Sequence, residues 1–209
     1  MSKRDTYRVL KSGARVEIKV KGSRFIAETF PVETVAAAEA RIAGVRKRAH
    51  DATHHCTAYR VGTGGERFRY HDDGEPSGSA GPPILRQIDA RGLTNTLVVV
   101  TRYFGGTKLG VGGLARAYGS AAAEALDASV LEERVLRVPV RLRFAYADTS
   151  PAMHTVERFR AEIMETQYGE ATELVVGVRR SEAEAFVEAF TEALGGRGRA
   201  SVEPGAAKE

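Results

Sequence analysis

Residues 97–126 have the sequence LVVVTRYFGGTKLGVGGLARAYGSAAAEAL, which predicts a strand, a glycine-rich loop and a helix in succession. The continuous apolar run from Leu97 to Val100 is typical of a strand that is covered on both faces. Small residues recur at positions 115, 117, 119, 121, 122 and 125. The helix that begins near Val111 is therefore expected to pack tightly against a sheet.

The loop between this strand and helix is rich in glycine and flanked by basic side chains. It predicts an anion-binding site, because N–H groups at the positive end of a helix dipole attract anions. The alternative is that the glycines only allow a tight turn and close helix–sheet packing. Neither the Walker A pattern nor G-x-G-x-x-G is present. The candidate anion-binding or nucleic-acid-binding residues are Arg102, Gly105, Gly106, Lys108, Gly110, Gly112, Gly113 and Arg116.

A second polar stretch, HDDGEPSGSAGPPIL at residues 71–85, predicts an acidic loop that leads into a helix. Ser77 or Ser79 is expected to cap that helix, with Pro82 and Pro83 in its first turn. One interpretation is a divalent-cation site or acid–base chemistry. The other, which we favour over a metal, is a capped turn whose acids complement a helix N-terminus or pair with Arg102 or Lys108. The acidic-loop candidates are Asp72, Asp73, Glu75 and Ser77.

These two motifs, together with KGSRFIA at residues 21–27 and ATHHCTAYR at residues 52–60, resemble the YigZ/IMPACT family. The resemblance covers about residues 16–126 and is to the two-domain bacterial members. It implies an N-terminal α/β domain similar to domain IV of elongation factor G, and a second domain similar to its domain V. Domain IV belongs to a superfamily that includes a small-subunit ribosomal protein and the GHMP kinases. These relatives bind RNA or nucleotide phosphates near the sheet, and the IMPACT branch is linked to translational control.

The rest of the N-terminal half alternates strands with one helix. Strands are predicted at residues 15–21, 24–30, 53–62 and 67–71, and an amphipathic helix at residues 33–50. The polar face of that helix is basic and is expected to be solvated, with phosphate binding as the alternative. The neighbours His54, His55 and Cys56 point to alternate faces of a strand, so we expect no metal site there.

The C-terminal half predicts the order β-α-β-β-α-β of a ferredoxin-like domain. We place the domains at residues 1–133 and 134–204, with a disordered tail at residues 205–209. Ser150 is expected to cap one helix, whose buried face extends to Ile163, and Ser181 with Glu184 to form a capping box on the other. No nucleophile, base or ligand set is arranged in this half, which predicts a recognition or packing module.

Composition excludes several classes of protein. The 209 residues contain no apolar run long enough to span a membrane, and the charged N-terminus lacks the apolar core of a secretory signal. A single cysteine excludes an internal disulfide, so we expect a cytoplasmic protein. Residues 1–133 hold 20 Lys and Arg against 15 Asp and Glu, whereas the remainder holds 11 against 12. The basic excess therefore belongs to the N-terminal half.

Three functions fit this sequence. The one we favour is a non-enzymatic module that binds RNA, DNA or the translation machinery, with translation regulation among its expected roles. The alternative is an enzyme that acts on a phosphorylated or acidic small molecule in a pocket between the two loops. A protein-interaction regulator is the third. No catalytic set, metal or cofactor and no membrane partner is predicted, and the oligomeric state is left open.

Overall fold

The protein is described by a computed structural model that covers residues 5–203. The chain divides into two compact units. One is Tyr7–Arg134, and the other combines the chain from Val135 onward with the residues that precede Tyr7, of which residues 5 and 6 are described. The first is a mixed α/β domain and the second has the ferredoxin-like order, so the predicted fold class is confirmed. The predicted tail at residues 205–209 lies outside the described residues.

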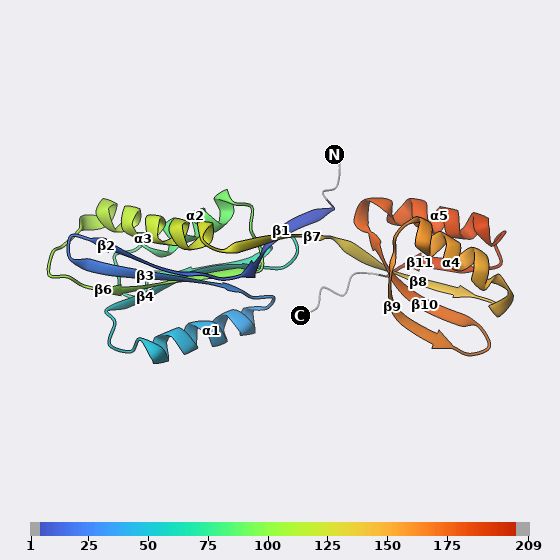
Figure 1. Ribbon diagram of the computed structural model, residues 1–209, viewed down its shortest axis with the longest axis horizontal. Coiled ribbons are helices and arrows are strands. Elements are labelled where there is room, and N and C mark those ends of the chain that lie inside the picture. Colours follow the sequence, from blue (N-terminus) through green and yellow to red (C-terminus); the bar gives the residue numbers. More distant parts are fainter. Residues whose placement is uncertain (1–4, 204–209) are drawn as a thin grey trace. The chain divides into compact units, whose positions relative to one another are not determined.

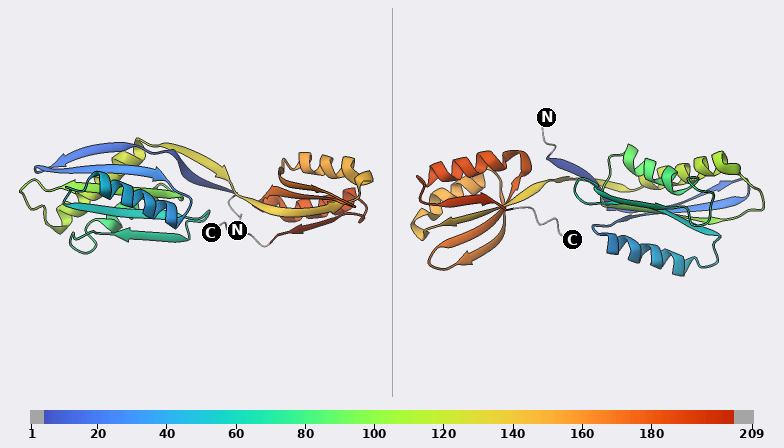
Figure 2. Two further views of the ribbon diagram at one scale, coloured as in Figure 1. Left: turned by 90° about the horizontal axis from the view of Figure 1, so that it is seen from below. Right: turned by 180° about the vertical axis from the view of Figure 1, so that it is seen from behind.

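The first domain is built on a five-stranded antiparallel sheet with the strand order β2-β3-β6-β4-β5. Its strands are β2 (Arg15–Val20), β3 (Ser23–Pro31), β6 (Thr96–Tyr103), β4 (His54–Val61) and β5 (Arg67–His71). Helices α2 (Gly81–Ala90) and α3 (Gly110–Asp127) cover one face, and α1 (Val35–Arg48) covers the other (Figures 1 and 2). The sheet is therefore a middle layer.

The apolar run on β6 forms the centre of this layer. Val98 and Val100 pack among α2 and α3, whereas Leu97 and Val99 pack against α1. A strand between two helical layers buries both of its faces, which explains why its sequence does not alternate. The small residues of α3, among them Ala121 and Ala122, are fully buried and let this helix lie close to the sheet.

A two-stranded sheet of β1 (Thr6–Ser12) and β7 (Val130–Val135) was not predicted. Residues 127–137 were expected to be a connection, and no strand was expected before residue 15. The sequence of β7, VLEERV, has no residue that is fully buried. Its partner lies about 120 residues earlier in the chain, so local patterning carries little information about this pair.

The second domain comprises β8 (Arg137–Phe144), α4 (Thr149–Arg158), β9 (Glu162–Tyr168), β10 (Thr172–Arg179), α5 (Ala183–Ala193) and β11 (Arg199–Val202). Its antiparallel sheet has the order β11-β8-β10-β9, and the two helices lie on one face (Figure 1). The core contains alternate residues of the strands, such as Leu142 and Val176, packed against Phe186 and Phe190 of α5.

Both predicted helix caps in this domain are wrong. The residue that precedes α4 is Asp148, so Ser150 lies within the helix. The residue that precedes α5 is Glu182, and the Ser181 hydroxyl binds Asp5 instead. Helix α4 ends at Arg158, and Ile163 belongs to β9, where its side chain is exposed.

Candidate functional site

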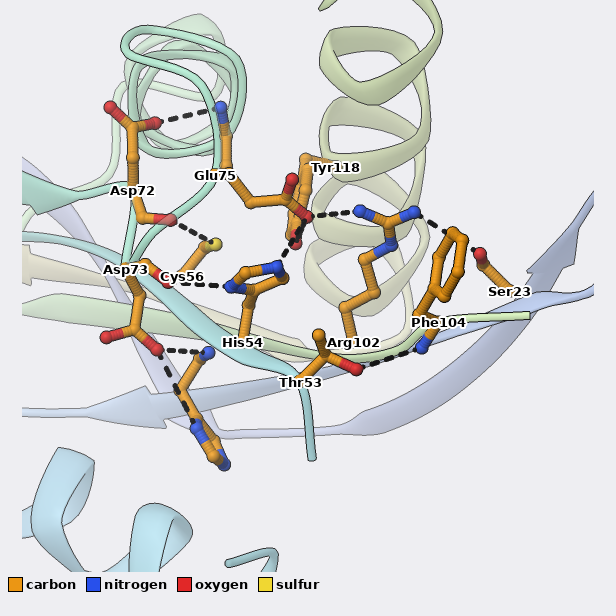
Figure 3. A network of polar contacts seen from close by, with 12 residues as sticks. Ser23, Thr53, His54, Cys56, Asp72, Asp73, Glu75, Arg102, Phe104 and Tyr118 are labelled. Atoms are coloured by element: carbon orange, nitrogen blue, oxygen red, sulfur yellow. Dashed lines mark hydrogen bonds and ion pairs between the residues drawn. The ribbon is translucent and has the colours of Figure 1, made fainter. Parts of the chain in front are cut away.

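The acidic loop and the glycine-rich unit are joined by a buried ion pair (Figure 3). Glu75, from the loop between β5 and α2, accepts a hydrogen bond at 2.6 Å from Nη1 of Arg102 on β6. The same carboxylate oxygen accepts a bond at 2.7 Å from the hydroxyl of Tyr118 on α3. Both side chains of the ion pair are at least nine-tenths buried. The predicted pairing of the acids with Arg102 is therefore present, through Glu75.

Arg102 is held by further contacts on its other sides. Its guanidinium carbon lies 5.4 Å from the centre of the Phe25 ring and 5.5 Å from that of Phe104. Its Nη2 lies 3.4 Å from the hydroxyl oxygen of Ser23. Within the described residues, its Nε is buried without a hydrogen-bond partner. Stacking and the Glu75 carboxylate thus fix this cation inside the domain.

Asp72 fixes the start of α2. Its carboxylate accepts bonds of 2.8 to 2.9 Å from the N–H groups of Gly78, Ala80 and Gly81. Burial acts to raise the pKa of Asp72, but these N–H donors outweigh it and hold that pKa below its usual value. The expected cap by Ser77 or Ser79 is wrong, since the residue before α2 is Ala80 and no side chain at that position caps the helix. Ser77 is exposed.

Asp73 connects the loop to β4 and α1. Its carboxylate accepts bonds of 2.6 Å from the N–H of His55 and from Nη2 of Arg46. Burial acts to raise its pKa, but the His55 N–H and Arg46 outweigh burial, and the net shift is downward. His54 donates from Nδ1 to the Asp73 carbonyl at 2.7 Å, and its Nε2 lies 3.8 Å from Glu75. The carboxylates of Asp72 and Asp73 therefore both have protein hydrogen-bond partners.

Cys56 lies beneath the acidic loop and is fully buried. Its thiol donates to the carbonyl oxygen of Asp72 at 3.0 Å. Burial raises the pKa of this thiol to about 12, so it is protonated at neutral pH and a poor nucleophile. Burial likewise raises the pKa of the Tyr118 hydroxyl. These groups pack and position the loop.

The glycines of the candidate loop have different roles. Gly105 packs on the β2–β3 turn, where an added Cβ would lie 1.9 Å from the carbonyl carbon of Gly22. Gly106 and Gly110 adopt left-handed φ values of 87° and 69°, which favour glycine. Gly112 and Gly113 belong to the first turn of α3. Gly112 does not have a positive φ, and an added Cβ there meets nothing nearer than 3.7 Å.

Exposed cations and one aromatic ring gather around this loop. Lys108 and Arg116 are exposed, and Nη1 of Arg116 lies close to Gly112 in the first turn of α3. Lys21 is exposed in the turn that contacts Gly105. Within residues 5–203, no carboxylate lies within 4.0 Å of these three cations. Phe104, which immediately precedes Gly105 in the chain, is 48% exposed. We call Lys21, Phe104, Lys108 and Arg116 the loop cluster.

The acidic loop and the strand that leads into the glycine-rich loop are in direct contact through Glu75 and Arg102. Cavities of about 430, 380 and 700 Å³ in the described part of the chain are lined by residues of neither loop. Among those residues, no group of three His, Cys, Asp or Glu side chains is arranged to hold a metal ion. No described helix combines the length and the apolar character that a membrane crossing requires.

The sequence did not single out Lys21, Ser23, Phe104 or Tyr118 as site residues. Tyr118 could have been singled out from the sequence, because it is a large aromatic residue on a helix face that otherwise holds alanine and glycine. A tyrosine hydroxyl that is buried there needs a hydrogen-bond partner. Lys21 and Ser23 had none, because the turn that carries them meets the glycine-rich loop, through Gly22 and Ser23, from about 80 residues away in the chain.

Comparison with known domains identifies the two halves of the chain. The profile of the Impact N-terminal domain matches residues 21–126, which include both loops and all three members of the Glu75–Arg102–Tyr118 contact. The chain belongs to the IMPACT family. A domain of unknown function, DUF1949, matches residues 142–197, within the ferredoxin-like half.

Relatives from several bacteria resemble this IMPACT family member. The IMPACT family member YvyE of Bacillus subtilis is 36% identical over 92% of this chain and 88% of its own length. An IMPACT family member of Haemophilus influenzae is 34% identical over 91% and 94%. YigZ of Escherichia coli is 42% identical over 52% of this chain and 54% of its own. A crystal structure of a hypothetical protein, 26% identical, superposes with a TM-score of 0.71 and covers 97% of this chain.

Proposed function

We propose that this IMPACT family member binds single-stranded nucleic acid, RNA in the first place, through the loop cluster. The observation that carries the proposal is the presence, on the segments around the β6–α3 loop, of an exposed ring and of cations that no carboxylate of residues 5–203 neutralises. Phosphates bind such cations and the free N–H groups of a helix N-terminus, while a base stacks on an exposed aromatic ring. A role in the translation machinery of the cytoplasm, the expected compartment, would use the same surface.

The ion pair between Glu75 and Arg102 supports this proposal indirectly. Arg102 is neutralised, so it does not serve as a phosphate ligand. Instead it lies beside Phe104 and holds the strand end from which that ring projects. The alternative basic surface on α1 is weaker, because Arg46 and Arg48 form ion pairs of 2.6 and 2.7 Å with Asp73 and Glu28.

The test is a salt titration of the affinity for a labelled single-stranded RNA and the matching DNA. Lys108→Ala should weaken binding and lower the salt slope by about one unit, largely independent of sequence. Phe104→Leu should weaken binding by about 5- to 150-fold, because stacking contributes roughly 1–3 kcal/mol per base. Lys47→Ala, which removes one charge from α1, is the matched control and should change little.

Two results would count against the proposal. Wild-type affinity weaker than a few hundred micromolar near physiological salt would exclude nucleic acid as the ligand, since about 100 micromolar is already the weak end of non-specific binding. A larger effect of Lys47→Ala than of Lys108→Ala would move the binding surface to α1.

A further inference from the structure

The end of helix α4 borders a hollow of about 430 Å³ that belongs entirely to the second domain. Its lining residues are Arg158, Phe159, Arg160, Arg179 and Glu182. This volume lies within the range of small-molecule sites. Phe159 is half-buried, with its ring packed edge-on against Phe186 of the core at 5.3 Å, so one wall of the hollow is a fixed aromatic side chain.

Three arginines line this hollow without an acidic partner. Within residues 5–203, no carboxylate oxygen lies within 4.0 Å of the side-chain nitrogens of Arg158, Arg160 or Arg179. Four other arginines of the domain do form ion pairs, namely Arg137, Arg141, Arg143 and Arg197. Glu182 contributes one carboxylate to the lining. Asp5, outside the lining, accepts a hydrogen bond from the N–H of Ser181 and places a second negative charge near Arg179. The lining therefore has an excess of positive charge.

Arg160 occupies a backbone position that normally selects glycine. It follows the C-cap of α4 with a left-handed φ of 49°. Its N–H bonds to Glu157, and the next N–H bonds to Val156. Helix α5 of the same domain ends with the same pair of bonds, and there the left-handed residue is Gly195. Arginine in this conformation carries backbone strain that glycine would not. Such strain is common at functional sites, which is a reason to ask what the Arg160 side chain binds.

We propose that this hollow binds a phosphate group carried by a ligand about the size of a mononucleotide. Guanidinium groups bind phosphate oxygens through paired hydrogen bonds, and three of them complement the charge of a phosphate monoester. The guanidinium carbon of Arg158 lies 5.4 Å from the centre of the Phe159 ring, so this ring positions one of the three cations. The site is independent of the loop cluster, because it uses only residues of the second domain.

The experiment is calorimetric titration of the full chain, at about 0.15 M salt, with AMP, inorganic phosphate and adenosine. AMP and phosphate should bind saturably, and adenosine should not. Arg179→Gln should weaken AMP binding about tenfold. Arg199→Gln removes the same charge from β11, at the opposite end of the sheet, and should leave the affinity unchanged.

Arg160→Gly separates binding from folding. It should raise the thermal midpoint, because glycine relieves the left-handed strain, and at the same time weaken AMP binding about tenfold. The proposal is overturned if AMP shows no saturable binding up to about 10 mM, beyond the weak end of ordinary affinities. It is also overturned if adenosine binds as tightly as AMP, or if Arg199→Gln weakens binding as much as Arg179→Gln.

Discussion

Replacing Glu75 by glutamine tests the buried ion pair most directly. The change preserves the shape of the side chain but leaves the guanidinium of Arg102 without a counter-charge in a site where it is 6% exposed. Removing one partner of a buried pair costs about 3–5 kcal/mol. Because domains of this kind are stable by about 5–15 kcal/mol, the variant should lose a large part of its free energy of unfolding.

The assay is thermal and urea unfolding of the full chain, followed by far-UV circular dichroism because the sequence contains no tryptophan. The midpoint of the first domain should fall by roughly 10–20 °C. The exposed pair of Glu17 and Arg24 supplies the control, and Glu17→Gln should have little effect. The double variant Glu75→Leu with Arg102→Met should recover much of the loss, because an apolar pair leaves no charge buried. A loss below about 1 kcal/mol for Glu75→Gln would refute this reasoning.

Four other predictions follow from the first domain. Cys56 should react with a thiol reagent at neutral pH far more slowly in the native chain than in urea, and rapid native labelling would contradict its burial. Since the pKa of Asp73 is lowered on folding, its contribution to stability is present above about pH 4 and lost as the pH falls below it. Asp73→Asn should therefore flatten the dependence of the unfolding free energy on pH between about 5 and 3. Gly105→Ala should destabilise the domain, because its Cβ would meet the backbone of Gly22. Gly112→Ala should stabilise α3 by about 0.5–1 kcal/mol, because its Cβ has room. Equal changes in the melting temperature of the two variants would contradict the packing of this loop. Residues 7–134 expressed alone should unfold cooperatively, and a non-cooperative melt would argue against an independent domain.

Much of the fold was predictable because it follows from local patterns. The continuous apolar run of β6 indicates a strand with two covered faces, and the order of elements in the second half indicates its topology. The cap of α2 was not predictable, because Asp72 binds N–H groups eight and nine residues further along the chain. Strand β7 was missed because its residues are only partly buried.

The candidate site was predictable only as far as its loops. Both motifs were recognised, and the pairing of an acid with Arg102 was among the alternatives. The sequence did not show that this pairing leaves Arg102 unavailable as a phosphate ligand. A glycine-rich sequence also does not tell which glycine takes the left-handed conformation, which the structure has at Gly106 and Gly110 but not at Gly112.

The position of β6 in the sheet has a consequence for synthesis of the chain. This strand lies between β3 and β4, yet it is the last of the five to leave the ribosome. Until about residue 103 has been made, β2–β3 and β4–β5 are separate hairpins, and each has an inner edge without a partner. Such edges invite pairing with other chains. The five-stranded sheet therefore cannot form until β6 has been synthesised. When β6 pairs with β3 and β4, it also places Arg102 against Glu75.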